Sequence, residues 1–214
     1  MKRLFCVISM TIAYVTLFAQ NWTTYKIGNI FTINMPSTME LRDNNSIVGS
    51  SFNEGVKILT MQYDEKKSDG KFVFQPVGLN STDIEKVMKA NDKYARVIVN
   101  VNRQNELTQK MTGALSTSEL KEIEKSWRKE PDNLWKNDTD YKWYPMERKQ
   151  YDGKYAIVTK YQRPAAIGGD SPVYVEEYKF FMTGKQITIT ISYRTSCASI
   201  YKTDFSKIMD TVKF

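Results

Sequence analysis

The residues best suited to chemistry lie in one stretch, residues 127–149, where flat aromatic side chains alternate with cationic ones. Three of the four tryptophans of the chain fall within it. Aromatic rings and arginine are favoured anchors of binding surfaces, because they bury a large area at a modest entropy cost. The stretch therefore predicts a contact surface made by Trp127, Trp135, Tyr141, Trp143, Tyr144 and Arg148.

This pattern is compatible with three roles, which the sequence leaves open. The aromatic residues could contact a partner protein, or they could bind a glycan or an anionic envelope polymer. They could instead pack helices onto a sheet while the neighbouring lysines are solvated. Replacement of Trp135 and Trp143 by alanine would separate these roles, because core residues support the fold and surface anchors do not.

Two adjacent carboxylates, Glu176 and Glu177, lie in a segment with strand character. Successive side chains of a strand point to opposite faces, so these two cannot form an acid–base pair with each other. Glu176 shares a face with Tyr174 and Tyr178, and we expect it to be partly exposed. A glycosidase needs two carboxylates that converge in a cleft. The sequence nominates no such pair, which leaves a carboxylate hydrolase as the third alternative.

Several other kinds of site are excluded by composition or spacing. The chain contains no histidine, which removes the mechanisms and metal sites that depend on imidazole. The short acidic runs at 64–65 and 138–140 lack the regular oxygen ligands and glycine of a calcium loop. The glycine pair at 168–169 lacks the continuation of a phosphate-binding loop. We therefore expect no catalytic residues, no metal and no cofactor.

The N-terminus predicts export. Met1–Arg3 is positively charged, Leu4–Phe18 is apolar and uncharged, and the chain becomes polar after Ala19. This pattern is typical of a cleavable signal peptide over residues 1–19, cut near Ala19–Gln20. The apolar run is short for a membrane span, so we expect no span after cleavage. The mature protein would be periplasmic or extracellular and would consist of one domain, residues 20–214.

Cleavage would leave Cys197 as the single cysteine, because Cys6 lies inside the apolar run. A lone thiol in an oxidising compartment is either buried or bonded to another chain, and we expect it to be buried. Removal of Lys2 and Arg3 with the leader would lower the formal net charge from +7 to +5. So small an excess does not indicate nucleic-acid binding.

The N-terminal half reads as short strands separated by turn residues. Alternation of apolar and polar residues and the Pro, Gly and Asn punctuation predict strands at 25–28, 30–35, 39–42, 47–52 and 56–63. Thr82 and Glu85 suggest a capping box for a helix ending near Ala90, with Ile84, Val87 and Met88 buried. A strand at 96–102 would bury Val97, Val99 and Val101.

The C-terminal half combines helices with hairpins. Helices are predicted at 106–114 and 116–130, the second capped by Ser116 and Glu119 with Leu120, Ile123 and Trp127 on one face. Asp152-Gly153 predicts a hairpin between strands 146–151 and 154–162. Strands 173–182 and 186–194 follow, then a helix over about 199–210 that buries Ile200, Tyr201, Phe205, Ile208 and Met209. The order implies an α+β fold, an antiparallel sheet with helices on its faces.

Both ends of the chain resemble a known superfamily. One end is Phe31–Leu41, an apolar strand that ends in Pro-Ser before a short second strand, and the other is Gly184–Phe214, a glycine turn, a strand of alternating isoleucines and a closing helix. This arrangement is similar to the PsbP-like α/β/α sandwich superfamily, which includes the extrinsic PsbP subunit of photosystem II and many exported bacterial proteins. The resemblance implies a non-enzymatic binding or assembly role and supplies no catalytic residues. Residues 104–144 have no counterpart in it.

The sequence thus predicts an exported, non-enzymatic binding or assembly module of the bacterial envelope that contacts an envelope or secreted protein. A glycan-binding or polymer-binding protein is the alternative.

Overall fold

The computed structural model describes residues 22–42, 47–53, 56–61, 70–103, 107–165 and 171–214. The predicted signal peptide and the glycine pair at 168–169 lie outside these residues, as does the acidic pair at 64–65. Within the described part, no helix is long and apolar enough to cross a membrane.

Most strands belong to a seven-stranded sheet in the order β3-β6-β7-β11-β10-β9-β8, with every neighbouring pair antiparallel. Its members are β3 (Met39–Leu41), β6 (Gly70–Pro76), β7 (Ala95–Arg103), β8 (Lys142–Tyr151), β9 (Lys154–Arg163), β10 (Val173–Met182) and β11 (Lys185–Arg194). The turn between β8 and β9 is the predicted Asp152-Gly153 pair. Both residues have positive φ angles, 45° and 75°, as a two-residue hairpin of this kind requires.

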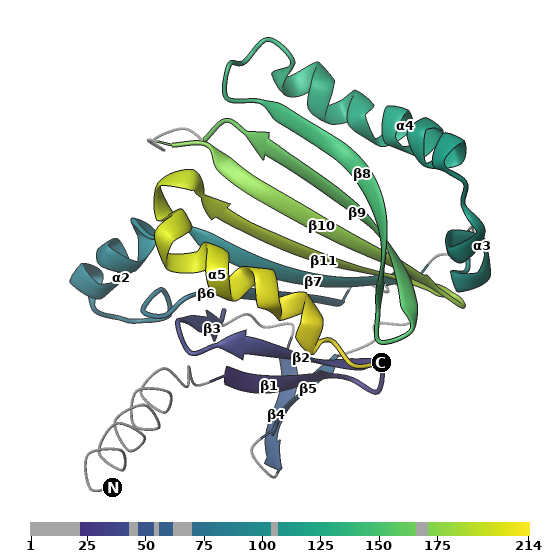
Figure 1. The fold of residues 1–214 in the computed structure, drawn as a ribbon. Helices are drawn as coiled ribbons and strands as arrows, with labels where there is room; N and C mark the ends of the chain where they lie inside the picture. Colours follow the sequence, from purple (N-terminus) through teal and green to yellow (C-terminus); the bar gives the residue numbers. More distant parts are fainter. Residues whose placement is uncertain (1–21, 43–46, 54–55, 62–69, 104–106, 166–170) are drawn as a thin grey trace, which may run out of the picture.

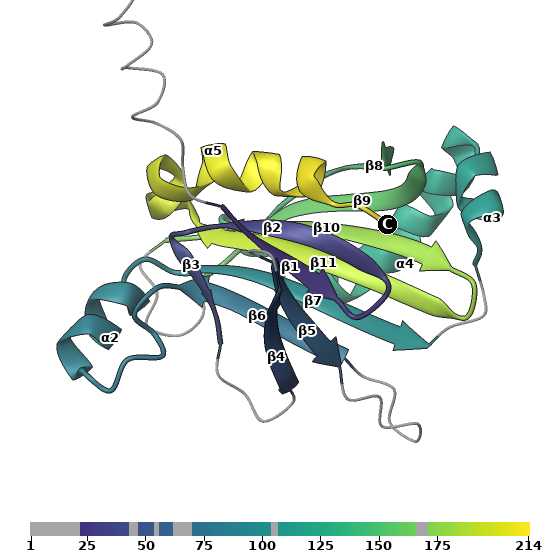
Figure 2. The same ribbon diagram turned by 90° about the horizontal axis from the view of Figure 1, so that it is seen from below.

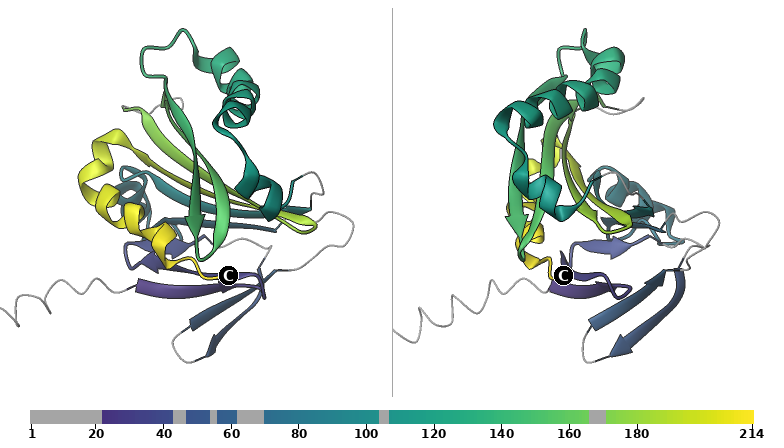
Figure 3. Two further views of the ribbon diagram at one scale, coloured as in Figure 1. Left: turned by 45° about the vertical axis from the view of Figure 1, so that its right-hand side comes forward. Right: turned by 90° about the vertical axis from the view of Figure 1, so that its right-hand side faces the viewer.

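A second sheet has the strand order β2-β1-β5-β4 and consists of β1 (Trp22–Ile27), β2 (Phe31–Pro36), β4 (Ile47–Asn53) and β5 (Val56–Met61). The pairing of β1 with β5 is parallel, and the other pairings are antiparallel. Figure 3 shows β4 and β5, drawn in blue, projecting away from the seven-stranded sheet. The sequence did not predict that the strands divide between two sheets.

Helices cover both faces of the large sheet, which confirms the predicted α+β architecture (Figures 1 and 2). The helices are α2 (Ile84–Asn91), α3 (Gln109–Ala114), α4 (Thr117–Trp135) and α5 (Ala198–Ile208). On one face, Phe205 of α5 contacts Tyr193 of β11, with ring centroids 5.9 Å apart. On the other face, Trp127 of α4 contacts Phe181 of β10, at 6.4 Å.

The main core lies between the large sheet, α5, and strands β1 and β2. It contains the alternating residues that the sequence predicted: Val97, Val99 and Val101 of β7, and Ile187, Ile189, Ile191 and Tyr193 of β11. From α5 and the short helix after it come Tyr201, Phe205, Ile208 and Met209. Cys197, 6% exposed, lies in this core, which confirms that it is buried.

A second, smaller core fixes α4 on the opposite face. Met146, Ile157 and Phe181 of the sheet meet Leu120, Ile123 and Trp127 of the helix, the helical face that the sequence predicted. The Ser116–Glu119 capping box is also confirmed: Glu119 N donates to Ser116 Oγ, and Ser116 N donates to Glu119 Oε2. The position of α4 is therefore set by its own apolar stripe and by its cap.

Four predictions about apolar residues and caps are wrong. Ile84 and Met88 of α2 are 76% and 65% exposed, and Ile200 of α5 is 42% exposed. Helical spacing identifies an apolar face, but it does not show that another element covers that face. The cap of α2 is Asp83, whose carboxylate accepts from Glu85 N, and Thr82 does not cap it.

Candidate functional site

Two aromatic grooves lie on opposite faces of the sheet at its β8–β9–β10 end. The tyrosine groove is a cavity of about 390 Å³ beside α5, lined by Tyr144, Tyr174, Glu176, Tyr193, Lys202 and Phe205 among others. The tryptophan groove is a cavity of about 330 Å³ beside α4, lined by Trp127, Trp135, Trp143, Tyr161, Glu177 and Lys179 among others. Because successive residues of β10 alternate between faces, that strand contributes to both grooves.

A row of stacked rings forms one wall of the tryptophan groove. Tyr161 of β9 stacks on Trp143 at 5.6 Å with an interplanar angle of 10°, and on Trp135 at 6.4 Å and 22°. The Lys179 ammonium lies 4.0 Å from the centre of the Trp127 ring and 3.4 Å from Glu177 Oε2. Three of the predicted contact residues, Trp127, Trp135 and Trp143, therefore do meet in one groove.

Two of these tryptophans also hold α4 on the sheet. Trp143 Nε1 donates a hydrogen bond to Glu124 Oε1 at 2.8 Å, and the backbone N–H of Met146 donates to Glu124 Oε2 at 3.2 Å. Trp127 packs against the second core. The packing role therefore describes the observed contacts of Trp127 and Trp143, while a role in binding stays a prediction.

Tyr141 has a local partner in the last turns of α4. Its hydroxyl donates to Asp132 Oδ1 at 2.8 Å, and Arg128 Nε donates to the same atom at 2.9 Å. Partial burial and the hydrogen bond to Asp132 raise the pKa of Tyr141 to about 12. Burial alone would raise the pKa of Asp132, but the bonds from Arg128 and Tyr141 outweigh it and hold that pKa below its usual value. These hydrogen bonds connect the last turns of α4 to Tyr141, which follows the helix.

Arg148 holds the end of α3. Its Nη1 atom lies 2.7 Å from the carbonyl oxygens of Gly113 and Leu115 and 3.5 Å from that of Thr112. The last carbonyls of a helix lack partners within the helix, and a guanidinium can satisfy several of them. The guanidinium also lies 5.6 Å from the centre of the Tyr155 ring.

Tyr144 lies on the other face of the sheet from the tryptophans, in the tyrosine groove. Trp143 pairs with Tyr161 and Tyr144 pairs with Lys160, so the two neighbours project to opposite sides. The predicted surface at 127–149 is therefore not one surface: it divides between the two grooves and the packing of α3 and α4.

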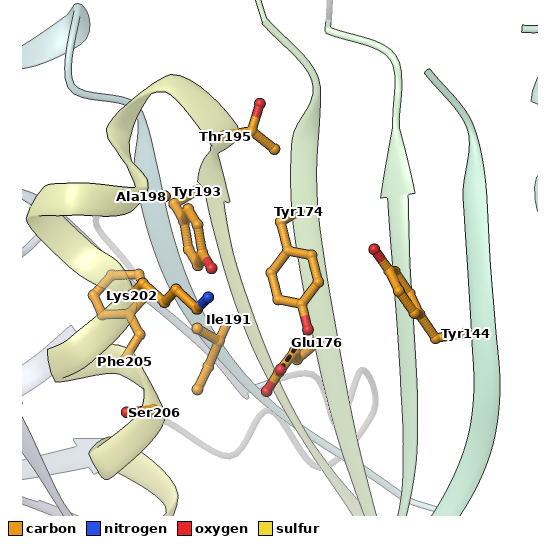
Figure 4. Close-up of a pocket in the computed structure, with 10 residues that line it drawn as sticks. All are labelled: Tyr144, Tyr174, Glu176, Ile191, Tyr193, Thr195, Ala198, Lys202, Phe205 and Ser206. Atoms are coloured by element: carbon orange, nitrogen blue, oxygen red, sulfur yellow. Dashed lines mark hydrogen bonds between the residues drawn. The ribbon is translucent and has the colours of Figure 1, made fainter. Parts of the chain in front are cut away.

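The tyrosine groove has a carboxylate at its centre (Figure 4). Tyr174 Oη donates to Glu176 Oε1 at 2.7 Å, and Tyr178 Oη donates to Glu176 Oε2. Burial, together with the nearby Glu176 charge, raises the pKa of both phenols well above the usual value. Both hydroxyls thus remain protonated donors at neutral pH. Glu176 is half-buried, as the sequence predicted.

Aromatic rings line the groove in a continuous series from β8 to α5. Tyr144 and Tyr174 meet edge to face at 6.2 Å, Tyr174 and Tyr193 lie 5.5 Å apart, and Tyr193 meets Phe205 at 5.9 Å. Figure 4 shows Lys202 and Phe205 entering the cavity from α5, opposite the strands. The groove is therefore closed on one side by the sheet and on the other by a helix.

The two charged residues that line this groove, Glu176 and Lys202, do not form an ion pair with each other. Among the residues that the structure describes, no Lys or Arg forms an ion pair with Glu176, and no carboxylate forms one with Lys202. In an adjoining cavity of about 510 Å³, which shares Glu176 and Ser206, Lys149 and Lys160 are both bound by Glu147 at 3.0 and 3.2 Å. Asp210 also lines that adjoining cavity.

The sequence did not identify Tyr193, Lys202 and Phe205 as site residues. Their signal was present but ambiguous, because Tyr193 and Phe205 carry the apolar alternation that also marks a core. Among the described residues, no three metal-ligating side chains cluster. The acidic run at 138–140 forms a turn in which Asp140 N donates to Asp138 Oδ1.

No protein-family model and no curated protein sequence matches the chain. Among solved structures, cyanobacterial PsbP (CyanoP) from Synechocystis is 15% identical, with 90% of this chain and 92% of that chain covered and a TM-score of 0.51. PA94 from Pseudomonas aeruginosa, of unknown function, is 10% identical (76% and 94% covered, TM-score 0.39). LpqN from Mycobacterium tuberculosis, involved in cell envelope biogenesis, is also 10% identical (94% and 94% covered, TM-score 0.37). The similarity to CyanoP shows that the chain has the PsbP-like fold, as its two ends predicted; at this identity it shows the fold alone.

Proposed function

We propose that this PsbP-like chain is a non-enzymatic binding module of the bacterial envelope, and that the tyrosine groove holds a group of its partner. The observation that supports this most strongly is Glu176, a half-buried carboxylate that accepts two tyrosine hydrogen bonds and is paired with no cation of the described residues. Taking an unpaired charge partly out of water costs free energy. Ligand sites place a few polar groups of this kind in an otherwise apolar or aromatic cavity.

The surroundings of Glu176 fit this role. Ligand cavities combine apolar and aromatic walls with a few convergent polar groups, in volumes of roughly 300–1,000 Å³. The tyrosine groove, at about 390 Å³, has three tyrosines, one phenylalanine, one carboxylate and one ammonium among its lining residues. The groove lies at the edge of the main core, on the same face of the sheet: Tyr193 and Phe205 belong to that core, and Tyr174 packs against it.

The proposed envelope location depends on the signal-peptide pattern of residues 1–19. The proposed kind of partner follows from that location. We propose export with cleavage near Ala19–Gln20, and an envelope or secreted protein as partner. A glycan is the alternative partner, because tyrosine faces next to hydrogen-bonding groups also suit sugars.

Site-specific cross-linking in the source organism tests this proposal. A photoreactive amino acid at Ser206, which lines both the groove and the adjoining cavity, should capture one partner in stoichiometric amount. The same group at Ser118, exposed on α4, is the matched control and should capture none. Equal capture from both positions, or no capture from Ser206 and no glycan retained by the purified protein, would refute the proposal.

A carboxylate hydrolase is the second candidate, and one observation favours it. Glu176 and Asp210 line the same adjoining cavity, and their charges both act on the hydroxyl of Tyr151. Glycosidases use two carboxylates that flank the scissile bond. Release of reducing ends from envelope polysaccharide, lost in both Glu176→Gln and Asp210→Asn, would establish this activity in place of simple binding.

A further inference from the structure

We propose that the group held in the tyrosine groove is zwitterionic, with an ammonium placed on Glu176 and an anionic group on Lys202. This inference rests on the proposed function and names the chemistry of the ligand. It follows from two opposite charges that line one cavity, lack partners among the described residues, and do not pair with each other.

The ammonium end is set by the negative charge of Glu176, which forms no ion pair with a described residue. An ionised carboxylate offers about four lone-pair sites, of which Tyr174 and Tyr178 use two. Those hydroxyls are neutral, so they orient the carboxylate and leave its negative charge in place. The positive charge of a ligand ammonium, including a quaternary one that donates no hydrogen bond, would neutralise this carboxylate.

The rings beside Glu176 also favour a cation. Aromatic faces attract ammonium groups within about 6 Å of the ring centre. Lysine ammonium groups already make this contact at this end of the sheet, with Lys142 5.0 Å from the centre of Tyr144 and Lys179 4.0 Å from that of Trp127. Because Lys142 takes one face of Tyr144, the rings of Tyr174 and Tyr193 are the main walls for the ligand.

The anionic end is set by Lys202 on α5. Its side chain enters the same cavity from the helix side (Figure 4). It differs from Lys149 and Lys160 of the adjoining cavity, which both share Glu147. A simple monovalent cation would be repelled by Lys202. A zwitterion with a carboxylate or phosphate near its ammonium can pair its positive group with Glu176 and its negative group with Lys202.

Calorimetric titration of the purified protein with glycine betaine and two charge variants of it tests the ligand class. Choline keeps the ammonium without the carboxylate, and tert-butylacetate keeps the carboxylate and the shape without the positive charge. We expect betaine to bind about tenfold more tightly than either, which corresponds to about 1.4 kcal/mol. Equal binding of betaine and tert-butylacetate, or no heat from betaine, would overturn the assignment.

Single substitutions test whether Glu176 and Lys202 bind the two charged ends of betaine. Glu176→Gln should weaken betaine by about tenfold, and Lys202→Met should weaken betaine while it improves choline. Glu177→Gln is the matched control, since the same residue type on the same strand faces the other groove, and it should bind betaine as the wild type does. If Glu176→Gln and Glu177→Gln weaken betaine equally, the ammonium does not sit on Glu176.

Competition with the Ser206 cross-link separates this inference from the function on which it rests. Loss of partner capture when betaine is present before irradiation shows that the partner carries the zwitterionic group. Betaine binding without a captured partner shows a free small ligand. Capture at Ser206 that betaine does not disturb, together with no betaine binding, would overturn the zwitterion and leave the binding module intact.

Discussion

Glu176 and Glu177 are adjacent in β10, yet their carboxylates lie on opposite faces of the sheet and in different grooves. Glu176 accepts hydrogen bonds from two tyrosines, whereas Glu177 lies 3.4 Å from the Lys179 ammonium. The pair therefore offers a test in which charge, residue type and strand are held constant, while the face of the sheet and the partners of the carboxylate change.

Glu176→Gln should leave the free energy of unfolding within about 1 kcal/mol of the wild type. The variant loses a charge-assisted hydrogen bond, but it also removes a half-buried charge that has no cation partner. Urea denaturation followed by circular dichroism measures this. A loss of several kcal/mol would mean that Glu176 supports the fold, and that its tyrosine bonds are structural.

Glu124→Ala should destabilise the protein by about 1–3 kcal/mol, because it leaves the indole N–H of Trp143 and the backbone N–H of Met146 without their acceptor. Glu122→Ala is the control, since Glu122 is an exposed glutamate of the same helix. The two free energies of unfolding are compared by urea denaturation. Equal values for the two variants would show that the Glu124 bonds do not fasten α4 to the sheet.

Arg148→Lys should lower stability by about 1 kcal/mol and should leave partner capture at Ser206 unchanged. A lysine lacks the planar guanidinium, whose Nη1 reaches the carbonyl oxygens of Gly113 and Leu115 while its carbon lies 5.6 Å from the centre of the Tyr155 ring. Arg103→Lys, at the exposed end of β7, is the control. Loss of partner capture with unchanged stability would restore Arg148 as the contact residue that the sequence predicted.

The domain should lose stability in alkali. Burial raises the pKa of Tyr201 to about 12, and burial together with carboxylate neighbours raises that of Tyr141 to about 12 and those of Tyr161, Tyr174 and Tyr178 further. A folded pKa above the unfolded value of about 10 means that the contribution is fully present below pH 10. It is lost as the pH rises through the folded values.

Near-ultraviolet absorbance of tyrosinate and circular dichroism, recorded over the same alkaline titration, check this. We expect some tyrosines to ionise only together with unfolding. Ionisation of every tyrosine near pH 10 in a domain that keeps its circular dichroism would contradict the burial described above.

The sequence predicted the elements that local chemistry determines. The alternation in β7 and β11, the Asp152-Gly153 turn and the Ser116–Glu119 cap depend on neighbours in the chain, and all are confirmed. Strand β6 was not predicted. The exposure of Ile84 on α2 could not be predicted, because it depends on which elements pack together.

The candidate site was predicted only in part, because successive side chains of a strand alternate between the two faces of the sheet. The contiguity of residues 127–149 predicts one surface, but alternation along β8 places Trp143 and Tyr144 on opposite faces. The same rule, applied to β10, had correctly separated Glu176 from Glu177. Lys202 and Phe205 complete the tyrosine groove from α5, and their placement depends on tertiary packing.

Fluorine NMR of the protein labelled with fluorotyrosine, titrated with an envelope extract of the source organism, tests the central claim most directly. The label reports on both grooves at once, since Tyr174 and Tyr193 line one and Tyr161 lines the other. We predict that the resonances of Tyr174 and Tyr193 shift or broaden while that of Tyr161 does not. A change confined to Tyr161, or none at any tyrosine, would contradict the assignment of the ligand site to the tyrosine groove.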